Sequence, residues 1–435
     1  MAPKALSYSR RSLLRGWSIL AVFSLALAGL FAILLVISRI PGMEDIAPWP
    51  TLFFQKGLVA HVILSFAVWY LAVFGCLIQI SIREDCKFFD KVGFFLAILG
   101  TILLLIPALL DRGEPTLNNY IPIIIDPLYY TGLLLLALGI LFTIVPIFQK
   151  HVQGPNLRGP GYIYIISIIA FILAATQLSN EPINYDYNEN LVWGGGHILQ
   201  CFNVILLLIA WSYLGDLIKP NLAYKVATIW LVSASLLGLS FYLIWNVMDE
   251  NQTQAFTHLQ KILGPPVVIF FVILLPSITT QIRNCNWQDP ANLSLWTSIL
   301  IFTVGGILGA FVDGIDTRTP AHYHGVIGGI NIAFVGLFYT IFLPMLGREI
   351  SAKRLIISQI ILYASGQLLF IIGMFLAGGM GAARKVMGTT IDMNNSIAIA
   401  AARIRDFGGG LAIIGGILFI YIALRALLGR STEKS

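Results

Sequence analysis

The sequence predicts an all-α polytopic membrane protein, folded as a bundle of 12 transmembrane helices. Of its 435 residues, 57% are hydrophobic and 11% are charged. That is more apolar side-chain surface than a soluble domain can bury. The apolar residues also gather in runs of about 20, which is the length of helix that crosses a bilayer. Short polar loops separate these runs, and no soluble domain is inserted between them.

The apolar runs define the expected domain organisation. We expect a single transmembrane domain over residues 1–435, with a short basic N-terminus at 1–16 and a tail at 429–435. The first run, 17–38, is too long for a signal peptide and lacks a small-residue cleavage site, so we expect it to remain as a helix. The expected spans are residues 17–38, 57–80, 91–110, 122–147, 162–179, 191–214, 223–247, 262–283, 292–315, 320–346, 354–378 and 404–427.

The basic residues orient the predicted helices. Lys4, Arg10, Arg11 and Arg15 near the N-terminus place that end in the cytoplasm by the positive-inside rule. An even number of spans then returns the C-terminus to the same side. The net charge of +6 reflects this placement of loops, and it gives no indication of nucleic-acid binding.

The cysteines exclude one class of chemistry. Cys76, Cys86, Cys201 and Cys285 are scattered, and they form neither a CxxC nor a CxxCH motif. The sequence therefore predicts no disulfide framework and no covalently attached c-type haem.

Two histidines, His322 and His324, lie at the start of the tenth predicted span. An imidazole within hydrocarbon is costly, so an ionisable residue there is a functional hypothesis by default. Two residues of α-helix turn by about 200°, so these side chains face nearly opposite sides of the helix. One helix can thus present an imidazole to each of two cofactors. The alternative is that neighbouring polar groups satisfy both histidines.

Five of the six histidines are expected at one depth, in the outer third of the membrane. His61 lies about one turn inside the second span, His197 lies near the start of the sixth, and His258 lies in the loop that joins the seventh and eighth. The remaining one, His151, is expected in an inner loop. Because imidazole is a good ligand for haem iron and for copper, this clustering favours metal cofactors.

Glycines lie next to two of these histidines. Gly194–Gly196 precede His197, and Gly325, Gly328 and Gly329 follow His324. They would let a flat macrocycle approach the backbone, although close helix packing also explains glycines in membrane helices.

The segment from Asp316-Thr317 to Ala321-His322-Tyr323-His324 is similar to the helix-10 signature of subunit I of the haem–copper oxidase superfamily. This superfamily includes cytochrome c and quinol oxidases and the related nitric oxide reductases. The resemblance covers nearly the whole chain, and it implies the subunit I fold. It also implies that His322 binds a high-spin haem and that His324 binds a low-spin haem.

Further motifs extend the resemblance. Ala60-His61 looks like the helix-2 motif of the family, which implies His61 as the second axial ligand of the low-spin haem. The stretch WGGGHILQ resembles the helix-6 segment, which implies His197 as a ligand of the non-haem metal, with His258 as another. The resemblance therefore implies two haems and one non-haem metal. That metal is normally copper, with iron or no metal as alternatives.

A glycine-rich segment ends in two basic residues. Gly378 to Lys385 is similar to the family segment whose adjacent arginines pair with haem propionates, which implies that role for Arg384 and Lys385. A guanidinium binds a carboxylate with two hydrogen bonds, whereas a lysine acts as a point charge. The alternative is that these residues are loop charges at the lipid headgroups.

Three positions depart from the family pattern. Oxidases carry two adjacent histidines in the connection between helices 7 and 8, but here His258 is followed by Leu259. Where many oxidases have a tyrosine one turn after the helix-6 histidine, this chain has Cys201, with Gln200 beside it. Asp126, in the outer part of the fourth span, either relays protons from outside or is paired within the bundle.

The function that the resemblance implies is catalysis in a respiratory oxidoreductase, with His197, His258 and His322 at the centre where dioxygen is reduced to water. The alternatives are a nitric oxide reductase that forms nitrous oxide, a haem-binding relative without a catalytic metal, and a secondary transporter with 12 helices. The implied partners are the lipid bilayer, other oxidase subunits and an electron donor, either a c-type cytochrome, a copper-domain subunit or quinol. The expected location is a bacterial-type inner membrane.

Overall fold

The structure is a computed structural model that describes residues 6–38, 42–46, 49–150, 152–216, 222–283, 285–312, 314–348, 350–383 and 395–429. In this part of the chain, 12 helices are long and apolar enough to cross a membrane. The predicted helical membrane fold is therefore confirmed. One two-stranded antiparallel sheet adds to it, with Glu114 paired to Ile125.

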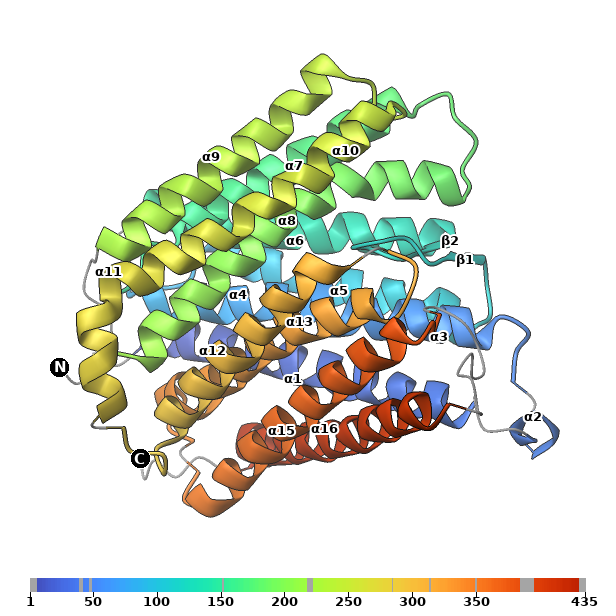
Figure 1. Ribbon diagram of the computed structural model, residues 1–435. Helices are drawn as coiled ribbons and strands as arrows, with labels where there is room; N and C mark the ends of the chain where they lie inside the picture. Colours follow the sequence, from blue (N-terminus) through green and yellow to red (C-terminus); the bar gives the residue numbers. More distant parts are fainter. Residues whose placement is uncertain are drawn as a thin grey trace. The chain divides into compact units, whose positions relative to one another are not determined.

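The helices and strands follow one another as shown in Figure 1. The elements are α1 Tyr8–Ile37, α2 Met43–Ile46, α3 Phe53–Val62, η1 Ile63–Val68, α4 Trp69–Ser81, α5 Phe88–Leu109, β1 Glu114–Thr116, β2 Ile123–Ile125, α6 Pro127–Gln149, α7 Arg158–Gln177, α8 Tyr185–Leu214, α9 Leu222–Ile244, α10 Glu250–Leu259, η2 Gln260–Leu263, α11 Gly264–Arg283, α12 Pro290–Leu308, η3 Gly309–Phe311, α13 Arg318–Leu337, η4 Phe338–Phe342, α14 Leu343–Met345, α15 Lys353–Gly379 and α16 Ser396–Leu428.

The chain forms two compact units. The first comprises Met1–Leu35, Ala47–Ser212 and Leu217–Asn284, and the second comprises Val36–Ile46, Tyr213–Asp216 and Cys285–Ser435. The two most buried spans are α8, which lies almost wholly in the first unit, and α13, in the second. These two helices carry three of the predicted site histidines.

Helices α5 and α6 of the first unit pack closely through glycines. A methyl group on Gly100 would lie 2.5 Å from the backbone nitrogen of Leu136, and one on Gly139 would lie 2.7 Å from that of Ala97. Small residues are common at such contacts because they let two membrane helices approach backbone to backbone.

In the second unit, α12 packs against α13 and α15 packs against α16 (Figure 1). A methyl group on Gly325 would lie 2.5 Å from the Cα of Gly305, so α12 and α13 touch at these glycines. In the same way, a methyl group on Gly415 of α16 would lie 2.6 Å from the backbone nitrogen of Tyr363 in α15. The close α12–α13 contact is important for the site because it places the backbone of α12 beside the histidines of α13.

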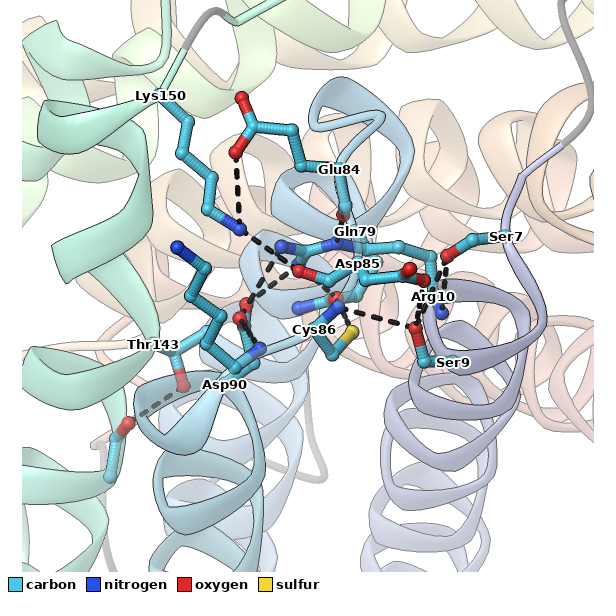
Figure 2. A network of polar contacts seen from close by, with 12 residues as sticks. Ser7, Ser9, Arg10, Gln79, Glu84, Asp85, Cys86, Asp90, Thr143 and Lys150 are labelled. Carbon is cyan, nitrogen blue, oxygen red and sulfur yellow. Dashed lines mark hydrogen bonds and ion pairs between the residues drawn. The ribbon is translucent and has the colours of Figure 1, made fainter.

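A buried ion pair joins the ends of α1, α4 and α5 (Figure 2). Arg10 donates through Nη1 to Asp90 at 2.6 Å and to the amide oxygen of Gln79 at 2.7 Å. Its Nε donates to the carbonyl oxygen of Glu84 at 2.8 Å. Asp90 also accepts from the backbone nitrogen of Lys87 at 2.9 Å, and it thereby caps α5.

Several boundaries differ from the sequence prediction. The span expected over 122–147 opens with strand β2, and its helix α6 begins only at Pro127, because Asp126 caps it there. Helix α1 begins at Tyr8 and α16 begins at Ser396, both earlier than the apolar runs. His258 lies in α10, not in a loop, and a candidate span begins at Glu250. Asp249 caps this helix by accepting from the backbone nitrogen of Asn251 at 2.8 Å. A hydropathy average misses such helical turns because their side chains are polar even though the backbone is helical.

Candidate functional site

The two histidines of α13 face different neighbours. His322 contacts α12, where its Nδ1 donates to the carbonyl oxygen of Gly305 at 2.7 Å. The ring of His324 lies 5.2 Å from that of Phe370 on α15, at an interplanar angle of 85°. The rotation of about 200° over two residues thus separates the imidazoles as expected.

The orientation of His322 is fixed by two glycines. Gly305 lies at the close contact between α12 and α13, so its carbonyl oxygen reaches Nδ1. A methyl group on Gly309 would lie 2.7 Å from Cε1 and from Nδ1 of the ring. Because a carbonyl oxygen only accepts, the proton is on Nδ1 and the lone pair is on Nε2. Ligating histidines are commonly oriented in this way.

His61 has the same arrangement in the first unit. It lies on α3, and its Nδ1 donates to the carbonyl oxygen of Ala28 on α1 at 2.9 Å. The segment that follows, η1 from Ile63 to Val68, is a π-helix, an irregularity that is frequent at functional sites. The carbonyl oxygen of His61 accepts from Ser65 at 2.7 Å.

His197 on α8 is 1% exposed, and both of its ring nitrogens have partners. Nδ1 donates to the carbonyl oxygen of Trp193 at 2.6 Å. Nε2 must then be the acceptor, and the hydroxyl of Tyr120 lies 3.0 Å from it. Burial raises the pKa of Tyr120, so its phenol is protonated and donates this hydrogen bond.

Glu189 on α8 holds the segment that carries Tyr120. One oxygen of Glu189 accepts from Asn118 Nδ2 and from the backbone nitrogen of Asn119, each at 3.0 Å. Its other oxygen accepts from Asn119 Nδ2 at 2.6 Å. Tyr120 follows with a positive φ of 65°, a left-handed conformation that is unusual for a tyrosine.

The predicted ligands of the non-haem metal are not alike in their surroundings. His258 is exposed on α10, whereas the ring of Phe256, two residues earlier, lies 5.6 Å from that of His197. Within the described ranges, no group of three or more His, Cys, Asp or Glu side chains could hold a metal ion. In the described part of the chain, neither His197 nor His258 belongs to such a group.

The other candidate positions have defined partners. Gln200 donates to the carbonyl oxygen of Gly196 at 3.4 Å. Cys201 is buried, and it forms a hydrogen bond with Ser235 of α9. Asp126 caps α6 by accepting from the backbone nitrogen of Leu128 at 2.8 Å. It also forms an ion pair with Arg112 at 3.1 Å, so this carboxylate is paired in the structure.

Arg384 and Lys385, the expected propionate partners, lie outside the described residues. The segment just before them does contact the start of α13, because Asp316 forms an antiparallel bridge with Ala383. The backbone nitrogen of Thr317 donates to the carbonyl oxygen of Ala382 at 2.9 Å. Two motifs that lie far apart in the sequence are therefore hydrogen-bonded to each other.

A comparison with protein families decides the classification. The family described as Cytochrome C and Quinol oxidase polypeptide I matches residues 13–404. The chain belongs to this family. Membership of the oxidase subunit I family implies haem groups and a metal centre, and it supports a general role as a respiratory oxidoreductase.

Two curated relatives are uncharacterized proteins. One, from Rickettsia prowazekii (strain Madrid E), is 26% identical over 94% of this chain and 95% of its own length. The other, from Aquifex aeolicus (strain VF5), is 28% identical over 74% of this chain and 83% of its own length. A solved structure described as a heme-copper terminal oxidase dimer is similar in fold, with a TM-score of 0.77. It is 16% identical and covers 99% of this chain and 86% of its own.

The residues fit haem better than they fit a third metal. His61 and His322 each direct Nδ1 to a carbonyl oxygen, which makes Nε2 the nitrogen that can bind iron. In the second unit, Oε1 of Gln367 is buried without a hydrogen-bond partner, and it lies against Gly328, one turn beyond His324. In the described residues, this amide oxygen thus lacks a hydrogen-bond donor beside the helix that carries His324.

Sequence reasoning missed Tyr120 and Glu189. Glu189 lies eight residues before His197, which is about two helical turns, so the two side chains share one side of α8. This spacing alone could have indicated that Glu189 lies on the side of the helix that carries His197. The position of Tyr120 was not readable, because it depends on a loop conformation that contacts distant in the sequence hold.

Proposed function

We propose that this chain is the catalytic subunit of a terminal oxidase that takes electrons from an external donor and reduces dioxygen to water at protein-bound haem. The observation that carries the proposal is the arrangement of α13, where His322 and His324 face α12 and α15, respectively. Haem, when bound, supplies one-electron transfer and an iron that can take a diatomic molecule.

The chain's own residues would hold and orient these groups. We assign His322 to a high-spin haem, and we assign His61 and His324 to a low-spin haem. The backbone acceptors at Gly305 and Ala28 keep the protons of His322 and His61 on Nδ1, so Nε2 is the ligating atom in both. Arg384 and Lys385 remain our candidates for the propionates.

The membrane setting follows from the same proposal. We place both chain ends on the cytoplasmic side of a bacterial-type inner membrane, because the basic residues gather at the N-terminus. We expect other oxidase subunits as partners, and either quinol, a c-type cytochrome or a copper-domain subunit as the electron donor. Family membership speaks against the alternative of a secondary transporter.

A second candidate function is a haem protein of this family that works without a non-haem metal. The observation that favours it is His197, whose two ring nitrogens already have partners. His258 remains a proposed ligand, and copper analysis of the purified protein separates the two candidates.

The test is to record reduced and carbon-monoxide difference spectra of full-length protein with single histidines replaced. We expect His61→Ala to lose the low-spin signal, and His322→Ala to lose carbon-monoxide binding. We also expect dioxygen consumption to fall by more than about tenfold in His322→Ala, because a ligand contributes at least as much as its supporting hydrogen bonds. His151→Ala serves as the control. The assignment fails if both variants keep both signals.

A further inference from the structure

His197 is the most completely enclosed of the site histidines. Its ring lies 4.5 Å from Tyr120, 4.7 Å from Trp193 and 5.6 Å from Phe256. Nδ1 donates a hydrogen bond to the carbonyl oxygen of Trp193, and the lone pair of Nε2 accepts one from the hydroxyl of Tyr120. A metal ion could bind Nε2 only after it displaced Tyr120.

The position of Tyr120 depends on a glycine of the same helix as His197. A methyl group on Gly196 would lie 2.7 Å from Cβ of Tyr120. A larger residue at 196 would therefore push the tyrosine away from the helix. Because Gly196 has no side chain, the ring of Tyr120 fits beside His197.

The segment that presents Tyr120 is held on both sides. Before it, Glu189 binds Asn118 and Asn119 through three hydrogen bonds. After it, the carbonyl oxygen of Pro122 accepts from the hydroxyl of Tyr129 at 2.8 Å. A non-glycine residue in a left-handed conformation costs on the order of 1–3 kcal/mol and persists only where its surroundings enforce it. Such outliers cluster at functional sites.

We propose that a hydrogen-bonded Tyr120–His197 pair takes the place that the family gives to a ligand of the non-haem metal. Tyr120 is then a positioning residue, which fixes the tautomer and the orientation of the imidazole. Glu189 is the side chain that clamps the segment around it. The role of this pair in an oxidoreductase rests on the proposed function, whereas the hydrogen bond itself can be measured independently of haem.

The experiment is nitrogen-15 NMR of full-length protein labelled at histidine and embedded in lipid. The sample is reduced and carbon-monoxide-bound, so that any haem iron present is diamagnetic. The resonances of His197 are identified by their loss in His197→Gln. We expect a protonated Nδ1 and an unprotonated, hydrogen-bonded Nε2, and we expect the Nε2 resonance to shift in Tyr120→Phe.

Tyr130→Phe is the matched control. It removes a tyrosine hydroxyl that also donates to α8, but to Asn188 at 2.9 Å and not to His197. We expect it to leave the His197 resonances unchanged. We also expect wild type and His197→Gln to contain the same amount of non-haem metal.

The inference is overturned if Tyr120→Phe leaves the Nε2 resonance unchanged. It is also overturned if His197→Gln loses one non-haem metal ion per chain. Haem content measured on the same samples tests the proposed function separately, because absence of haem would contradict that function while the histidine resonances still decide the pair.

Discussion

Arg10 and Asp90 have no exposed side-chain surface, and they form an ion pair of 2.6 Å (Figure 2). Gln79 and the carbonyl oxygen of Glu84 accept two more hydrogen bonds from the guanidinium. A buried ion pair of this kind often stabilises a fold no more than apolar side chains of the same size would. Breaking it is destabilising, however, because one charge then stays buried without a partner. The pair therefore specifies how α1, α4 and α5 come together.

This contact predicts a non-additive pattern of stabilities. We expect Asp90→Asn and Arg10→Met each to lower the free energy of unfolding by roughly 3–5 kcal/mol, with much of that loss recovered in the double variant. These free energies of unfolding are measured on the protein in lipid nanodiscs. Glu84→Gln is the control, because it changes a 3.6 Å pair with Lys150 in which Glu84 is 54% exposed, and it should cost less than about 1 kcal/mol. Losses that simply add would contradict the account.

At the scale of elements, α12 and α13 together determine the orientation of the His322 ring. The glycine contact between them supplies the acceptor for Nδ1, and Gly309 leaves room for the ring. A helix that only carried a histidine would leave the ring free to rotate. The neighbouring helix therefore selects the orientation.

Gly309→Ala tests this relation between the two helices. Its methyl group would lie 2.7 Å from the ring, so we expect His322 to move, at a cost of about 1–3 kcal/mol for overpacking. The carbon-monoxide difference spectrum should change in shape or amplitude. Gly306→Ala, three residues earlier on α12, is the control, because a methyl group there meets nothing within 4 Å. Equal spectra for both variants would exclude a role of Gly309 in orienting His322.

The sequence was enough to predict the membrane-spanning helices, but not the short sheet between α5 and α6 or the contacts between helices. Hydropathy identifies the helices because each span must present apolar side chains to lipid. Helical rotation predicts that His322 and His324 face different sides of α13, and the structure places them against different helices, α12 and α15. The Tyr120–His197 contact joins residues 77 positions apart, and it depends on a left-handed backbone, so no local pattern encodes it.

At the scale of the whole molecule, family membership and helix count agree. The match to Cytochrome C and Quinol oxidase polypeptide I covers residues 13–404, and 12 candidate spans lie in the described chain. A fold alone does not establish a reaction, since the chemistry depends on the site. The proposed activity therefore depends on whether the three histidines of α3 and α13 hold haem.

The most direct measurement is the amount of haem per chain in the purified full-length protein, combined with dithionite-reduced and carbon-monoxide difference spectra. We expect two haems per chain, one of them low-spin and one that binds carbon monoxide. A protein that folds in the membrane and contains no haem would contradict this expectation.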